Sequence, residues 1–128
     1  MGRAVIAMAL VGGATLWAYQ PVWRAHWVYE DVNAAAQAED VHATRWATAW
    51  TWRLASTPSR AHALNLGLHL LIGAVLGVAA WRWGWTPFGA MLATGLWWLH
   101  GMNVETAAYA TGRTEQIACV GILLAGLC

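Results

Sequence analysis

The sequence predicts an all-α integral membrane protein, with three to four transmembrane helices and a polar loop that bears short interfacial helices. Of its 128 residues, 59% are hydrophobic and only 10% are charged, whereas about a quarter of a soluble domain is charged. Eight of its eleven Trp gather near the ends of apolar runs, as the aromatic belts of membrane proteins do. The net charge of +1 provides no basic field, so we expect no nucleic-acid partner.

The first element is an apolar run that begins at Ala4, and Trp17 and Trp23 lie at or beyond its end. We predict a transmembrane helix over residues 4–23, which approaches the length of about 20 residues that a bilayer requires. A signal peptide is the alternative, because Gly12 and Ala14 are small enough to mark a cleavage point.

A polar loop follows over residues 24–59 and carries charges of both signs, so it is too polar to span a membrane. Asp31 and Asp40 each precede an Ala-containing stretch, where a helix cap is expected. Trp46, Trp50 and Leu54 then recur at a spacing of four. We therefore predict short helices that lie flat at the membrane surface, with an irregular solvated loop as the alternative.

The strongest predicted span covers residues 60–83, with Ser59 as its cap and Trp81 and Trp83 at its exit. Five of its residues follow one another at spacings of three or four and therefore share one face: His62, Asn65, His69, Gly73 and Gly77. The two glycines form a GxxxG pattern, which allows another helix to approach closely. We expect this face to pack against other integral membrane subunits.

Thr86 and Pro87 predict the start of a third span over residues 87–100. A polar connection over residues 101–113 follows it, and then an apolar run over residues 114–128. That last run corresponds to about 22 Å of helix against a hydrocarbon core of about 30 Å, so we predict a partial fourth span. The whole chain is expected to form a single membrane domain over residues 1–128.

An ordered set of polar residues recurs in the second half of the chain: His62, Asn65 and His69, then His100, Val104-Glu105, Tyr109 and Gly112-Arg113. The set resembles the amino-terminal module of GT-C-type glycosyltransferases, in the tetratricopeptide-linked branch that uses dolichyl-phosphate-mannose. Tyr29-Glu30-Asp31 is similar to the paired acidic motif of that family's first outer loop. Two residues depart from the pattern, since Gly101 replaces a proline and Glu30 replaces the first acid. Family members also have many more spanning helices, so the likeness is to a truncated form.

The resemblance implies a transfer reaction from a polyprenyl-phosphate-linked sugar. Glu30 or Asp31 would be the catalytic base, with Glu105 as a second carboxylate. His100 and Arg113 would contact the donor phosphate. The alternative is structural: Asp31 caps a helix, and Glu105 forms an interfacial ion pair with Arg113.

Two functions follow. The first is a non-catalytic accessory subunit of a larger membrane complex, docked through the face of Gly73 and Gly77, and truncation favours it. The alternative is a part of an active glycosyltransferase. No Cys and His spacing matches a metal site, so no cofactor is expected, although His69 could in principle ligate a haem or chlorin.

The expected location is a bacterial inner membrane, with lipids and other integral subunits as partners. Alternating helices would place the six acidic residues on or beside one membrane face, with Arg3 and Arg82 opposite. The count of Arg favours the acidic side in the cytoplasm, and the resemblance favours the reverse.

Overall fold

A computed structural model describes residues 2–26, 46–109 and 112–128, and all regular elements in these ranges are helical. They are α1 (Gly2–Ala18), η1 (Gln20–Arg24), α3 (Trp46–Leu54), α4 (Pro58–Arg82), α5 (Pro87–Leu99), η3 (Gly101–Asn103), α6 (Val104–Ala108) and α7 (Arg113–Leu127). The all-α prediction is therefore confirmed for this part of the chain.

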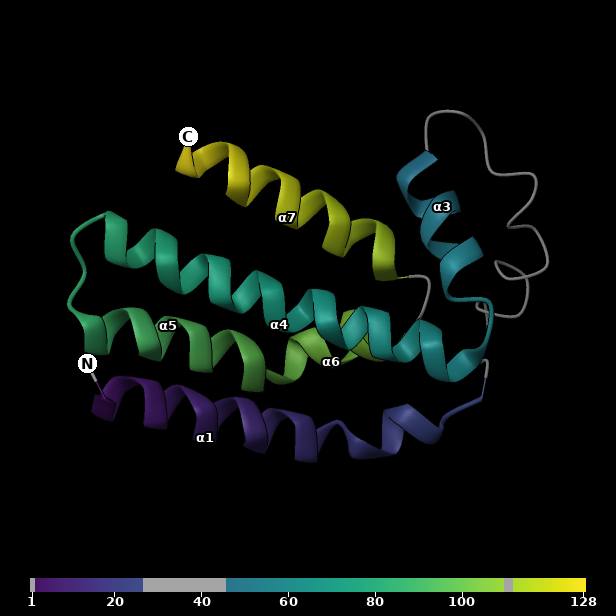
Figure 1. Ribbon diagram of the computed structural model, residues 1–128, viewed down its shortest axis with the longest axis horizontal. Helices are drawn as coiled ribbons and strands as arrows, with labels where there is room; N and C mark the ends of the chain where they lie inside the picture. Colours follow the sequence, from purple (N-terminus) through teal and green to yellow (C-terminus); the bar gives the residue numbers. More distant parts are fainter. Residues whose placement is uncertain (1, 27–45, 110–111) are drawn as a thin grey trace.

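The long helix α4 is the centre of the arrangement (Figure 1). One of its sides packs against α5, which in turn contacts α1, and its other side packs against α7. The short helices α6 and η1 contact α4 as well, and α3 contacts α7 near the beginning of α4. Each of the other helices is thus placed directly or indirectly by α4.

The predicted first span over residues 4–23 is divided into two helices of different kinds. Helix α1 ends at Ala18, and the 3₁₀ helix η1 continues to Arg24. Pro21 explains the division, because proline donates no backbone hydrogen bond and disfavours the α conformation of the residue before it. A tighter 3₁₀ turn accommodates it in the first turn of η1.

Helix α4 begins one residue before the expected cap, with Thr57 at the N-cap and Pro58 in the first turn. Proline is favoured there because the backbone N–H groups of the first turn have no acceptor within the helix, so the absence of one breaks no helical hydrogen bond. Ser59, predicted to cap this helix, lies inside it instead.

The turn between α4 and α5 is a Schellman motif. The N–H of Trp85 donates to the carbonyl of Ala80 at 3.0 Å, and the N–H of Gly84 donates to that of Trp81 at 3.1 Å. Gly84 has a φ of 88°, a conformation that suits glycine. Thr86 then caps α5, as the sequence predicts, by accepting a bond from the N–H of Gly89 at 3.1 Å.

Among the described helices, α4 is the one that is long and apolar enough to cross a membrane by length and composition. A shorter apolar helix covers Ile6–Ala18. Helices α5 and α7, where further spans were predicted, have 13 and 15 residues. The short helix predicted from Trp46, Trp50 and Leu54 is present as α3, whereas Asp31 and Asp40 lie outside the described residues.

Candidate functional site

The interior of the protein is rich in polar side chains while many large apolar side chains are on the outside. Seven buried polar or charged residues lie along the helix interfaces: Thr15, His62, Asn65, His69, Thr94, Arg113 and Gln116. The exposed residues include Leu10 and Trp17 of α1, Leu96 of α5 and Ile122 of α7, each more than half exposed. Burying polar groups costs free energy unless they are hydrogen-bonded, so their contacts define the candidate site.

Arg113 is the centre of the first cluster, and its side chain is fully buried. Its Nε donates to Oδ1 of Asn65 at 2.9 Å, and its Nη2 donates to the carbonyl of Ala61 at 3.4 Å. Its Nη1 donates to Oγ1 of Thr51 at 3.5 Å. The ring of Trp52 covers the guanidinium, with Cζ 4.6 Å from the ring centroid, a cation–π arrangement. One residue therefore joins α3, α4 and α7.

The position of Arg113 in its own helix is unfavourable for a cation. It is the first residue of α7, where the helix dipole favours negative charge. The contacts to Asn65 and Trp52 must offset that repulsion as well as the cost of desolvating a guanidinium. We conclude that the contacts of Arg113 with α3 and α4, rather than helix α7 alone, determine the position of its guanidinium.

Asn65 extends the cluster to α6. Its Oδ1 accepts the bond from Arg113, and its Nδ2 donates to the carbonyl of Tyr109, the C-cap of α6. Gly112 brings the same segments close together, because a Cβ on it would lie 2.7 Å from the carbonyl oxygen of Thr106. Both ends of the connection between α6 and α7 are thus fixed against α4.

His69 belongs to a second cluster, at the middle of α4. Its Nε2 lies 3.2 Å from the carbonyl oxygen of Trp98, and its ring contacts those of Tyr19 and Trp97, with centroids at 5.5 and 6.1 Å. The last carbonyls of a helix lack partners within it. His69 therefore satisfies one at the end of α5, and Nδ2 of Asn103 satisfies the carbonyl of Trp97 at 2.8 Å.

This arrangement does not suit the ligation of a haem or chlorin at His69. The side chain is buried and Nε2 is engaged by the carbonyl of Trp98. A tetrapyrrole would also have to displace the rings of Tyr19 and Trp97 from the imidazole. The described residues contain no cluster of three or more His, Cys, Asp or Glu placed to hold a metal ion.

The face of Gly73 and Gly77 is covered by α5 of the same chain, which corrects the expectation that another subunit packs there. A Cβ on Gly77 would meet the side chain of Thr94 and the carbonyl of Ala90, and one on Gly73 would meet the indole of Trp98. Oγ1 of Thr94 donates to the carbonyl of Gly73 at 3.0 Å. The glycines do allow close helix packing, but within the chain.

Three of the five residues predicted to act on a donor sugar lie in the described part of the chain, and they differ in burial. His100 and Glu105 are exposed, whereas Arg113 is buried in the first cluster. Glu30 and Asp31 lie outside the described residues. His62 is buried in the first half of α4.

Sequence reasoning missed the contributions of Thr51, Thr94 and Gln116. Nε2 of Gln116 donates to the carbonyl of Thr106 at 3.0 Å, which ties α7 to α6. The signal for Thr94 was available, because a threonine within an apolar helix commonly bonds to a neighbouring helix. Thr51 lies in the predicted polar loop and Gln116 follows Glu115, so no comparable contrast marks either residue.

No family model, curated protein or solved structure matches the chain.

Proposed function

We propose that the protein is an integral membrane helical module that serves as a non-catalytic accessory subunit of a larger membrane assembly. The observation that carries the proposal is that seven polar or charged side chains are buried while many large apolar side chains are exposed. In lipid, apolar side chains on the outside carry no free-energy penalty, and every backbone polar group needs a hydrogen-bond partner within the protein. The bacterial inner membrane stays our prediction for the location.

The end of α5 supports this interpretation. Helix α5 stops beside His69, near the middle of α4, which is the candidate membrane span. Irregular backbone at such a depth is tolerated only where protein satisfies its polar groups. His69 and Asn103 accomplish this by donating to the carbonyls of Trp98 and Trp97.

The burial of Arg113 supports a non-catalytic role. A guanidinium that binds a donor phosphate must direct its N–H groups toward the substrate. Here Nε, Nη1 and Nη2 each donate to a group of the chain, and Trp52 covers one face. Arg113 thus acts as an internal link between helices.

Partner subunits would contact the outer faces of α1 or α7, because α5 covers the face of Gly73 and Gly77. Ile6 and Leu10 of α1, and Ile122 of α7, are each more than 60% exposed. Helices α1 and α7 have 17 and 15 residues, at or below the lower end of the range of about 17 to 25 that crosses a bilayer. A partner packed beside α1 or α7 would occupy the part of the bilayer thickness that these short helices do not cross.

The alternative function is a part of a glycosyltransferase that uses a polyprenyl-phosphate-linked sugar. One contact favours it: Asn65 and Arg113, both members of the family-like set, are hydrogen-bonded to each other. Such a contact would let the set act as a unit if further helices provided a substrate cavity.

The two functions are separated by two measurements on the same preparation. We expect the chain to stay in membranes after alkaline carbonate washing and to migrate in mild detergent with other integral proteins. Its release by carbonate would contradict the membrane proposal. Sugar transfer from a polyprenyl-phosphate donor is then measured for the purified chain, for Asp31→Asn and for Asp40→Asn as the matched control. Transfer that is lost only in Asp31→Asn would establish the alternative.

A further inference from the structure

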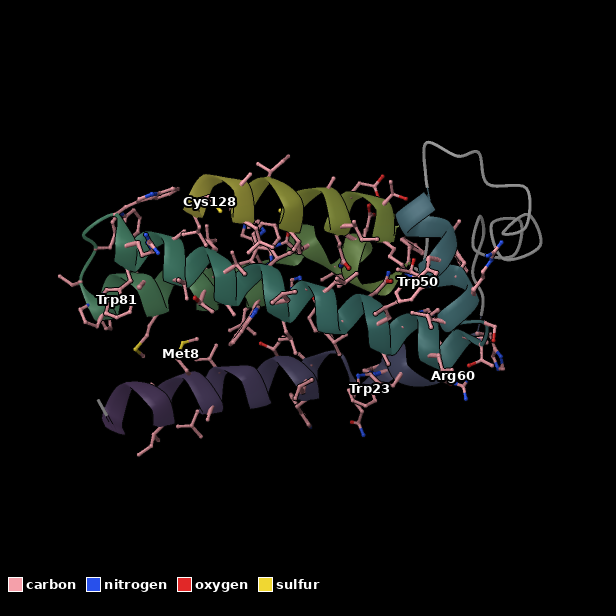
Figure 2. The ribbon with its side chains drawn as sticks, turned by 45° about the horizontal axis from the view of Figure 1, so that its top comes forward. Met8, Trp23, Trp50, Arg60, Trp81 and Cys128 are labelled. Carbon is pink, nitrogen blue, oxygen red and sulfur yellow. The ribbon has the colours of Figure 1, made fainter. Side chains whose placement is uncertain are left out.

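The turn between α4 and α5 presents four aromatic side chains around one arginine. Trp81, Trp83, Trp85 and Phe88 are each more than half exposed, and Arg82 is exposed among them. Figure 2 shows Trp81 at the opposite end of α4 from Arg60. We call residues 81–88 the aromatic–arginine turn. Exposed aromatic groups of this density mark an interaction surface.

The backbone of this turn is fixed. The Schellman bonds to Ala80 and Trp81 hold its first half, and the Thr86 cap holds its second half. The indole-bearing residues therefore start from one backbone arrangement, so binding orders little additional chain. A preorganised surface is favoured over a mobile loop as a binding surface for this reason.

Charge identifies the kind of partner. Residues 61–104 contain no Asp or Glu, and neither do residues 1–29. Helix α1 begins at the same end of the molecule as the turn (Figure 1). Arg82 therefore lies in an acid-free, cationic part of the chain, whereas Arg60 follows the loop that carries four of the six acidic residues. The sequence near the aromatic–arginine turn therefore attracts an anion more than the sequence around Arg60 does.

We propose that the aromatic–arginine turn binds the headgroup phosphate of an anionic phospholipid. The guanidinium of Arg82 offers the paired donors that suit a phosphate, and indoles favour the headgroup level of a bilayer. The inference rests on the proposed membrane function, since it requires this end of α4 to lie at a membrane surface.

The test measures lipid binding to the full chain in non-ionic detergent by native mass spectrometry. The probes are phosphatidylglycerol and phosphatidylcholine, with inorganic phosphate as competitor. We expect Arg82→Gln to weaken phosphatidylglycerol binding about fivefold, the effect of one arginine near an anionic surface. Arg60→Gln is the matched control and should bind as the parent does. Trp83→Ala should weaken the binding of both lipids alike, because the interaction of an indole with a lipid does not depend on the charge of the headgroup.

Unchanged phosphatidylglycerol binding by Arg82→Gln would overturn the proposal, and so would an equal loss in Arg60→Gln. Displacement of the lipid by inorganic phosphate would identify a free-anion site instead. Arg82 also stabilises the C-terminal end of α4, so thermal unfolding is recorded without lipid to separate that effect. A chain that stays in carbonate-washed membranes but shows no Arg82 effect contradicts this inference alone, whereas a chain released by carbonate contradicts the proposed function.

Discussion

The two sides of α4 are held by different kinds of interaction. Toward α5, Gly73 and Gly77 allow close packing, and hydroxyl and indole groups donate to main-chain carbonyls. Toward α7, Arg113 gathers three acceptors and an aromatic ring. The first side distributes its stability over many small contacts, and the second concentrates it in one residue. Substitutions should therefore have graded effects on one side and a large effect at a single position on the other.

The largest effect is expected for Arg113→Leu. It removes the donor from the buried Oδ1 of Asn65 and from the carbonyl of Ala61. Breaking such a buried charged interaction costs about 3 to 5 kcal/mol of unfolding free energy. The measurement is reversible unfolding in mixed detergent micelles. The unfolding free energy of Arg113→Lys should lie between those of the parent and of Arg113→Leu, because an ammonium group cannot reach all of the same acceptors.

Arg60→Leu is the control for this prediction, because Arg60 is exposed on the same region of α4. Its unfolding free energy should stay within about 0.5 kcal/mol of the parent. Equal losses in the Arg60 and Arg113 variants would show that the α7 side does not depend on one buried residue.

Gly77→Leu is expected to cost about 3 kcal/mol, the upper part of the range for overpacking. A Cβ there would lie 3.3 Å from the carbonyl oxygen of Ala90, a backbone atom that cannot move away without moving α5. Gly67→Leu is the matched control on the same helix, since its Cβ position has no heavy atom within 4 Å apart from adjacent residues and the backbone of its own helix. If both variants unfold alike, α5 does not pack on α4 as described.

Gly112→Ala tests whether the α7 side also contains a close backbone contact. Its Cβ would lie 2.7 Å from the carbonyl oxygen and 3.0 Å from the Cα of Thr106. We expect a loss of about 2 kcal/mol, measured in the same unfolding assay. Gly121→Ala, in open space on α7, should instead gain about 0.5 kcal/mol because alanine favours the helix. A stable Gly112→Ala protein would contradict the contact between α6 and α7.

Much of the helix pattern is predictable because it depends on local chemistry. Thr86 and Pro87 mark the start of α5, and the recurrence of Trp46, Trp50 and Leu54 indicates α3. The division at Pro21 was not predicted, because the apolar residues Val22 and Trp23 follow the proline and favour an extension of the span. Hydropathy records burial in lipid or protein and does not distinguish an α-helix from a 3₁₀ turn.

The site was less predictable, because it depends on which helices meet. The sequence placed His62, Asn65, His69, Gly73 and Gly77 on one face, and all five are buried. Each four-residue step advances about 40° around a helix, so Asn65 and Gly77 are about 120° apart. Asn65 therefore meets Arg113, whereas Gly77 meets α5. The pattern identified buried residues, and the choice between an internal neighbour and a partner subunit required the fold.

The smallest effect is expected for Thr94→Val on the α5 side. The one hydroxyl hydrogen of Thr94 is shared between the carbonyls of Gly73 and Ala90, whose oxygens lie 3.0 and 3.1 Å from Oγ1. Both residues lie inside helices, where their carbonyls can also accept backbone bonds, so valine leaves no buried acceptor without a donor. The expected loss is about 0.6 kcal/mol, the usual value of such a bond between membrane helices. Thr94→Ser keeps the donor and should lose only methyl packing. A loss in Thr94→Val as large as that of Arg113→Leu would mean that the α5 side also depends on a single polar residue.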